Sequence, residues 1–367
     1  MKTQTIAVIV LFVLTTMLIA GCTSKSSQTI KVGFISPLST DAAIIGVQQM
    51  NAVKLAVDEI NAEGGINGKQ LEVIYEDSKC DGKEAVNAVN KLISVDNVHV
   101  ILGDICSGAT LAVKPITEEN AVLMFTWGSS PDVTKNSSYI VRNSPADDSA
   151  GKELAQYIYS HGTSKLAVLT LNSDFTNALL VPLKQEFERL GGTIVAYESL
   201  DPSASDFRAS VTKIKQGSPD AIVVLGTDPA NTGAMVRQVR EQGLEQQLYS
   251  AYAFSAPSAV EAAGSENAKG LVYLDAPSLN ESNNDAESFI EKYTSTYGST
   301  PQGSEFYAAA AYDSVYIIKD ALLACGQDTG CMKNEITGTE FNGALGSYGF
   351  TESGDVRNVG FSMNRIE

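Results

Sequence analysis

The stretch "LGDICSGAT", residues 102–110, places Cys106 and Ser107 at the end of an apolar run, where they could act as nucleophiles or help to hold a ligand. A nucleophile needs a neighbouring base. The chain offers His99, inside the apolar "VHVIL" run, and His161, in a helix-ending "SHG", and neither is near a strand exit. The stretch also lacks the G-x-S-x-G pattern of a nucleophile elbow. These residues therefore favour binding over catalysis.

Binding at this stretch can be carried by main-chain donors. The residues before Gly103 are typical of a buried strand, and those after Cys106 are typical of a helix. Ser107 is expected to cap the helix, which leaves the N–H groups near Gly108, Ala109 and Thr110 pointing outward. Together with the helix dipole they predict an anion site without a charged side chain. The alternative is that these residues only cap a helix and form a turn.

A second hydroxyl-rich exit follows the next apolar run, in "TWGSS". It contains Trp127, Gly128, Ser129 and Ser130. Adjacent parallel strands end at the same edge of a sheet, so both exits are expected to face one cleft that suits a carboxylate or a polar amide. Trp127 could form an apolar wall or stack on a planar ligand, or it could simply pack in the core.

The elements that position these exits alternate along the chain. Short β-rich apolar runs, such as "KVGFIS" and "AIVVLG", are separated by amphipathic helical patterns. Asp81 and Glu84 form a capping-box pattern ahead of one such helix. Runs that are apolar throughout indicate parallel strands buried on both faces. The sequence predicts an α/β protein with two doubly wound domains, the second opening near Pro145.

The first residues predict the compartment. Lys2 precedes an apolar run that ends in "LIAGC", which is typical of a lipoprotein signal peptide over residues 1–21, with Cys22 as the lipidated residue. Residues 22–29 then form a tether. The alternative is an uncleaved membrane anchor, and both place the body outside the cytoplasm, attached to a membrane.

Charge and motifs exclude several partners. The net charge of −17 argues against nucleic acid and anionic lipid headgroups. A phosphate-binding loop is incomplete in "EGGINGKQ", where Glu63 replaces the first glycine and Gln70 replaces the Ser or Thr. No cofactor is expected.

Four cysteines remain after Cys22, which allows three pairings in a compartment that permits disulfides. Cys80 with Cys106 and Cys325 with Cys331 is the favoured set. Metal binding by these thiols is the weaker alternative, because no C-x-x-C spacing or adjacent histidine accompanies them.

From residue 30 onward the chain resembles the type I periplasmic binding proteins of the branched-chain amino acid and amide class. The similar segments occur in the family's order: "VGFISPLST", "AVDEINAEGGINGKQLEVIYEDSKCD", "ILGDICSGAT", "MVRQVREQGL" and "FNGALGSYGFTESGD". The resemblance implies two Rossmann-like lobes joined by three crossings that close about a hinge. It assigns residues 30–143 and 277–338 to lobe one, and residues 144–276 and 339–367 to lobe two. A disulfide like Cys80–Cys106 also occurs in similar proteins.

The resemblance also implies a set of ligand contacts. Ser107 matches a serine that holds the ligand carboxylate, and the "TWGSS" turn matches a loop that binds carboxylate and ammonium. One residue is missing from this turn relative to the family, so Ser129 and Ser130 compete for that role. Phe175 lies where an aromatic side chain of lobe two closes over the ligand.

Two positions depart from the family. Asp228 stands roughly where a ligand-facing tyrosine is usual, and Tyr252 lies where amino acid binders often carry a glutamate for the ammonium group. A buried ammonium without a counter-charge is costly. Either Asp228 or Asp174 supplies the charge, or the ligand has no ammonium group.

The function implied is that of a lipid-anchored, extracytoplasmic receptor, which delivers a small amino acid or amide to an ABC permease and performs no covalent chemistry. It is expected to act as a monomer. A ligand sensor for a membrane signalling protein is the alternative, and a hydrolase is a third, weaker one.

Overall fold

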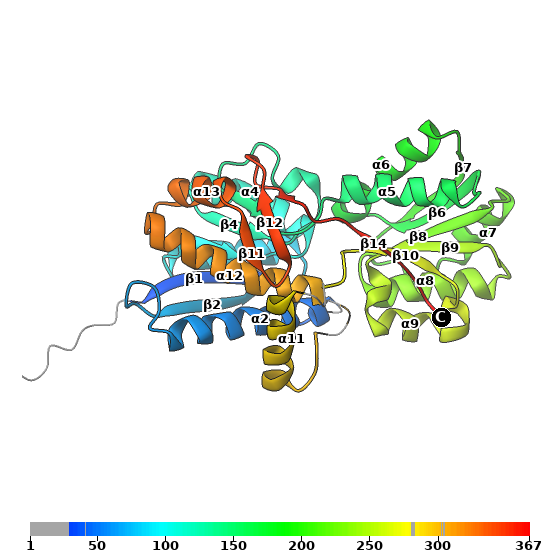
Figure 1. Ribbon diagram of the computed structural model, residues 1–367. Helices are drawn as coiled ribbons and strands as arrows, with labels where there is room; N and C mark the ends of the chain where they lie inside the picture. The colour runs from blue at the N-terminus through cyan, green and yellow to red at the C-terminus, as the bar shows by residue number, and fades with distance from the viewer. Residues whose placement is uncertain (1–28, 41, 280–282, 302, 304) are drawn as a thin grey trace, which may run out of the picture.

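The computed structural model describes residues 29–40, 42–279, 283–301, 303 and 305–367. The predicted signal peptide, Cys22 and all but the last residue of the tether lie outside these ranges. The described chain forms two α/β lobes that lie side by side (Figure 1). Among the described residues, no helix has the length and apolar character that crossing a bilayer requires.

Lobe one is built on a five-stranded sheet in the order β2-β1-β3-β4-β5, all parallel. The strands are β1 (Ile30–Ser36), β2 (Leu71–Asp77), β3 (Val100–Leu102), β4 (Leu123–Thr126) and β5 (Ile140–Arg142). Successive side chains point to opposite faces. In β3, Val100 and Leu102 enter one core cluster while Ile101 enters the other. The apolar run of β3 is thus buried on both faces, as predicted, whereas the edge strand β2 is mostly half-buried.

Helices cover both faces of this sheet. Helices α3 (Gly82–Ser94) and α4 (Ser107–Glu119) pack on the face of Ile101, and α2 (Ala43–Ala62), α11 (Asn284–Tyr297), α12 (Glu305–Cys325) and α13 (Thr329–Gly338) pack on the other. Asp81 caps α3 as expected, since its carboxylate accepts from the N–H groups of Lys83 and Glu84. Helix α12 therefore belongs to lobe one, although it comes late in the chain.

Lobe two has a six-stranded sheet in the order β14-β10-β9-β8-β6-β7, in which only the pairing of β14 with β10 is antiparallel. The strands are β6 (Lys165–Leu171), β7 (Thr193–Leu200), β8 (Ala221–Leu225), β9 (Gln247–Ala251), β10 (Val272–Asp275) and β14 (Ser362–Arg365). Helices α5 (Asp147–Ser160) and α6 (Asp174–Arg189) cover one face. Helices α7 (Arg208–Gln216), α8 (Pro229–Glu241), α9 (Pro257–Ala263) and α10 (Ser265–Ala268) cover the other.

The C-terminal segment divides between the lobes. Strands β11 (Phe341–Gly343), β12 (Gly346–Phe350) and β13 (Val356–Arg357) form a small antiparallel sheet on lobe one, drawn in red in Figure 1. Tyr348 and Phe350 are buried in the lobe-one core, and Asp313 of α12 accepts from the N–H groups of Ala344 and Leu345. The expected placement of this segment in lobe two is therefore wrong up to residue 357. Only β14 reaches lobe two.

Both favoured disulfides are confirmed, and the chain joins Cys80 to Cys106 and Cys325 to Cys331. The first bond links the segment before α3 to the residue that precedes α4. It therefore fixes the start of α4, where the anion site is predicted. The second closes the turn between α12 and α13.

Candidate functional site

A cavity of about 540 Å³ lies between the lobes, at the carboxyl ends of strands from both sheets. This is where an open parallel sheet binds its ligand. Six of the ten predicted ligand contacts line the cavity: Ser107, Gly108, Ser129, Phe175, Asp228 and Tyr252. The other four, Thr110, Trp127, Gly128 and Ser130, do not line it. Their places in the structure explain the difference.

The amino end of α4 opens into the cavity. Cys106 occupies the N-cap position without a side-chain cap bond, so the prediction that Ser107 caps the helix is wrong. Ser107 is instead the first helical residue, and its Oγ accepts from the N–H of Ser130 at 3.1 Å. The N–H of Thr110 already donates to the carbonyl of Cys106. The helix-terminal donors are therefore the N–H groups of residues 107–109, one residue earlier than expected.

Asp104, which the sequence reasoning missed, holds both strand exits together. Its side chain accepts from the N–H of Cys106 at 2.8 Å, and its carbonyl accepts from Thr126 Oγ1 at 2.8 Å and from the N–H of Trp127 at 3.2 Å. Burial raises the pKa of Asp104 to about 7. An acid directly after an apolar strand is the signal that could have identified it.

Thr110 and Gly128 support the site from behind. Thr110 Oγ1 lies 3.1 Å from Thr126 Oγ1, which accepts from the N–H of Gly128 at 3.0 Å. A Cβ at position 128 would lie 3.1 Å from Thr110 Oγ1 and 3.4 Å from the Cα of Ser107. The turn therefore packs against α4 because this residue has no side chain.

Ser129 and Ser130, the two alternatives for one role, have different environments. Ser129 lines the cavity, and its hydroxyl donates to Asp147 Oδ2 at 2.8 Å. Ser130 Oγ caps a short 3-10 helix, η1 (Pro131–Val133), by accepting from the N–H of Asp132. The geometry therefore favours Ser129 as the residue that meets a ligand.

Trp127 lies in the core of lobe one, where it is completely buried. Its ring packs against Phe34 at a centroid distance of 6.1 Å, and Nε1 donates to Ser314 Oγ at 3.4 Å. The packing alternative therefore holds, and the expectation of a tryptophan wall is wrong.

The opposite wall comes mainly from lobe two. The rings of Phe175, on the first turn of α6, and Tyr252, after β9, lie 5.9 Å apart. Tyr252 has a φ of 56°, which is uncommon for a residue with a side chain. Its hydroxyl donates to Asp147 Oδ1 at 3.3 Å. Tyr307 of α12, which the sequence reasoning missed, lines the same cavity from lobe one.

The two acids considered for an ammonium group both line the cavity but differ in their bonding. Asp228 is the N-cap of α8, and its carboxylate accepts from the N–H of Asn231 at 2.8 Å and from Asn231 Nδ2. Asp174 is the exposed first residue of α6, and a Cβ built at Gly108 would lie 3.1 Å from its Oδ2. Asp228 therefore has a structural task, and Asp174 lies beside the amino end of α4, where the anion site is predicted.

Two further charged residues flank the connection from β5 to α5. Arg142 is buried and donates to the carbonyls of Ser129 and Ser130 at 2.7 and 2.8 Å and to Asp355 Oδ1 at 2.6 Å. Asp147 is buried as well, and burial raises its pKa to about 7. The sequence reasoning interpreted "NSPADD" only as a domain boundary, although two adjacent acids at a helix start were visible there.

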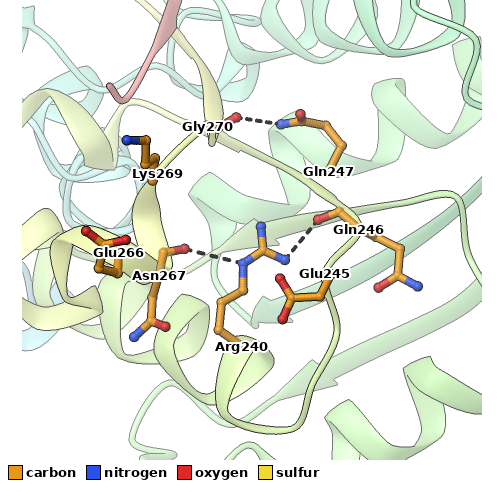
Figure 2. Close-up of a pocket in the computed structure, with 8 residues that line it drawn as sticks. All are labelled: Arg240, Glu245, Gln246, Gln247, Glu266, Asn267, Lys269 and Gly270. Atoms are coloured by element: carbon orange, nitrogen blue, oxygen red, sulfur yellow. Dashed lines mark hydrogen bonds between the residues drawn. The ribbon is translucent and has the colours of Figure 1, made fainter.

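A second cavity, of about 430 Å³, lies at the amino ends of β9 and β10, away from the strand exits (Figure 2). Its lining is polar, and Arg240 and Lys269 are balanced by Glu245 and Glu266. Arg240 Nη1 donates to the carbonyls of Leu244 and Gln246 at 2.6 and 3.0 Å. The arginine thus holds a loop, which is a structural task. In the described part of the chain, no group of three or more His, Cys, Asp or Glu could hold a metal ion.

Sequence comparison identifies the family of this chain. The model described as "Periplasmic binding protein" matches residues 29–360. The leucine-, isoleucine-, valine-, threonine- and alanine-binding protein of Pseudomonas aeruginosa is 27% identical over 353 residues, which is 95% of this chain and 93% of that protein. Leu/Ile/Val-binding protein homolog 1 of Brucella abortus is 27% identical and covers 92% of this chain and 90% of its own.

Solved structures agree with this. The substrate-binding protein LivJ of a branched-chain amino acid transporter from Streptococcus pneumoniae, in complex with isoleucine, superimposes with a TM-score of 0.83 at 27% identity. The superposition covers 93% of this chain and 97% of LivJ. A solute-binding protein of an ABC transporter from R. palustris, in complex with benzoate, has a TM-score of 0.80 at 17% identity, over 93% and 94% of the two chains. The second likeness concerns the fold alone.

Proposed function

The chain belongs to the periplasmic binding protein family, and on this premise we propose that it binds an amino acid or amide outside the cytoplasm and delivers it to an ABC permease. The observation that carries the proposal is the cavity of about 540 Å³ between the lobes, with the amino end of α4 at its wall. Cavities of this volume suit small ligands. The chain binds its ligand and releases it unchanged.

The ligand's carboxylate or amide oxygen binds at the amino end of α4. The N–H groups of Ser107 and Gly108 and the positive end of the helix dipole favour an oxygen that carries negative charge. The hydroxyl of Ser107 is buried beside them and can donate as well. An apolar side chain of the ligand is accommodated by Ile45 and Ile105 of lobe one and Phe175 of lobe two.

Closure about the hinge reports that the ligand is bound. A ligand shifts a two-state equilibrium only if it binds one state more tightly than the other. Residues of both lobes line this cavity, so a ligand that contacts both favours the arrangement in which the lobes are close. The permease would recognise this closed form, and lipid on Cys22 would keep the protein at the membrane.

A thermal-shift screen of the purified protein tests the binding proposal. The probes are L-leucine, L-isoleucine, L-alanine, acetamide and, as carboxylates without an ammonium group, benzoate and 4-methylpentanoate. A ligand that binds only the folded form raises the melting temperature, by mass action. We expect an amino acid or acetamide to raise it, and the ligand recovered from the complex to be chemically unchanged. A shift with the simple carboxylates alone would contradict the amino acid or amide assignment.

A further inference from the structure

The first crossing between the lobes is bonded to the ligand loop at several points. The crossing comprises residues 142–147, and the loop comprises residues 126–130. Arg142 holds two loop carbonyls, the N–H of Asn143 donates to the carbonyl of Thr126, and Ser144 Oγ donates to the carbonyl of Trp127. The loop is therefore fixed by the same segment on which the lobes turn.

Asp147, at the end of this crossing, bonds to one cavity-lining side chain from each lobe. Its Oδ2 accepts from Ser129 Oγ of lobe one at 2.8 Å, and its Oδ1 accepts from the hydroxyl of Tyr252 of lobe two at 3.3 Å. The carboxylate is completely buried, while Ser129 and Tyr252 both line the cavity. The acid thus contacts the ligand site through two hydroxyl groups.

These bonds determine which way the two hydroxyls face. A hydroxyl has one hydrogen to donate and lone pairs to accept with. When Ser129 and Tyr252 both donate to Asp147, their oxygens offer only lone pairs to the cavity. Two acceptors backed by one buried negative charge suit a ligand group that donates N–H bonds, above all an ammonium.

We propose that Asp147 is a positioning residue, which turns the Ser129 and Tyr252 hydroxyls into acceptors and supplies the counter-charge for an N–H donor group of the ligand. This inference rests on the proposed function, since it concerns the same cavity. The inference also accounts for the absence of an acidic residue at position 252. Tyr252 stands where a glutamate was expected, and Asp147 lies directly behind Tyr252. A ligand held by its oxygen at α4 would reach this pair with its nitrogen.

The test compares two probes that differ only in the amino group, L-leucine and 4-methylpentanoate, by isothermal titration of the purified full chain. In Asp147→Asn one hydroxyl must reverse, because the new amide accepts on one side and donates on the other. We expect the affinity for L-leucine to fall tenfold or more and that for 4-methylpentanoate to change less than threefold. A purely structural role for Asp147 would weaken both probes alike.

The matched control is Asp148→Asn, which removes the same charge from the next residue. Asp148 is partly exposed and pairs with Lys152 at 3.3 Å, so we expect both affinities to stay unchanged. Tyr252→Phe, which keeps the ring and loses one acceptor, should show the same selective loss if Asp147→Asn fails to fold. An equal loss for both probes, or an unchanged affinity for L-leucine, would overturn the inference alone. If the wild-type protein bound neither probe and none of the screened amino acids or acetamide, the proposed function would fall, and this inference with it.

Discussion

Ser107 and Ser129, two of the serines that line this cavity, differ in the hydrogen bonds that their hydroxyl groups make. Ser129 donates its hydrogen to Asp147 and so presents an acceptor. Ser107 Oγ accepts from the N–H of Ser130, which leaves its own hydrogen for a ligand oxygen. One side of the site is thus suited to a carboxylate and the other to an N–H donor. The sequence shows hydroxyl groups at these positions but not their direction, because the partners Ser130 and Asp147 lie 23 and 18 residues away.

Removing the Ser107 hydroxyl tests the carboxylate side. We expect Ser107→Ala to weaken ligand binding by about 1–3 kcal/mol, the usual loss when a charged oxygen loses one donor. The free energy of unfolding should also fall, by about 1–3 kcal/mol, because the buried N–H of Ser130 loses the Ser107 hydroxyl as its acceptor. Isothermal titration and thermal unfolding measure the two effects separately. An unaltered affinity for the ligand that the screen identifies would refute the assignment.

Of the helices and strands, α4 contributes most to the site, and its position in the chain could largely be predicted from the sequence. The apolar run "VHVILG" and the small residues after it indicate a strand followed by a helix, and the structure has β3 and α4 there. The start of the helix was misplaced by one residue. Capping serines are common, so Ser107 was the natural choice, but the disulfide and Asp104 hold Cys106 at the N-cap position instead.

Gly108, in the first turn of α4, provides a test at this level. A methyl group there would lie 3.1 Å from Asp174 Oδ2, at the end of an exposed side chain that can move away. Alanine favours a helix over glycine by no more than about 1 kcal/mol. We therefore expect Gly108→Ala to keep or slightly raise stability while it lowers ligand affinity, because the methyl group enters the cavity beside the helix donors. Improved binding together with improved stability would contradict this view of the helix end.

The small C-terminal sheet shows what a pattern of elements cannot predict. Residues 341–357 form short strands, and nothing in their periodicity identifies the lobe they join. Tertiary contacts determine that they join lobe one. Tyr348 and Phe350 complete its core, and Asp313 accepts from two N–H groups and the Tyr348 hydroxyl. Asp313 was visible only as an acid within an apolar helix. Trp127 was misjudged for a similar reason, since its neighbours Phe34 and Ser314 are remote in sequence.

At the scale of the whole molecule, several carboxyl groups are buried in or beside the sheets and the crossing at residues 142–147. Burial raises the pKa values of Asp104, Asp147, Asp275 and Asp313 from an ordinary 3.8 to about 7. The folded chain therefore binds more protons than the unfolded chain between about pH 4 and pH 7. Its free energy of unfolding must decrease as the pH rises through this window.

Thermal unfolding of the ligand-free protein at pH 5 and pH 7 checks this expectation. We expect the melting temperature to be higher at pH 5, and the partial neutralisation of a net charge of −17 acts in the same direction. Below about pH 4 the trend should reverse, because Arg189 lowers the pKa of Glu186 to about 2 and that contribution is lost on protonation. A melting temperature that rises steadily from pH 5 to pH 7 would contradict the raised pKa values of these four buried carboxyl groups.

The late position of α12 in the chain has a consequence for biogenesis. Residues 305–325 cover the face of a sheet whose first strand begins at residue 30, and α12 supplies many of the buried side chains on that face. When only the first 300 residues have been synthesised, the face of the lobe-one sheet that α12 covers is therefore still exposed. Lobe one thus cannot complete its core until α12 has been synthesised, although most of lobe two precedes this helix in the chain.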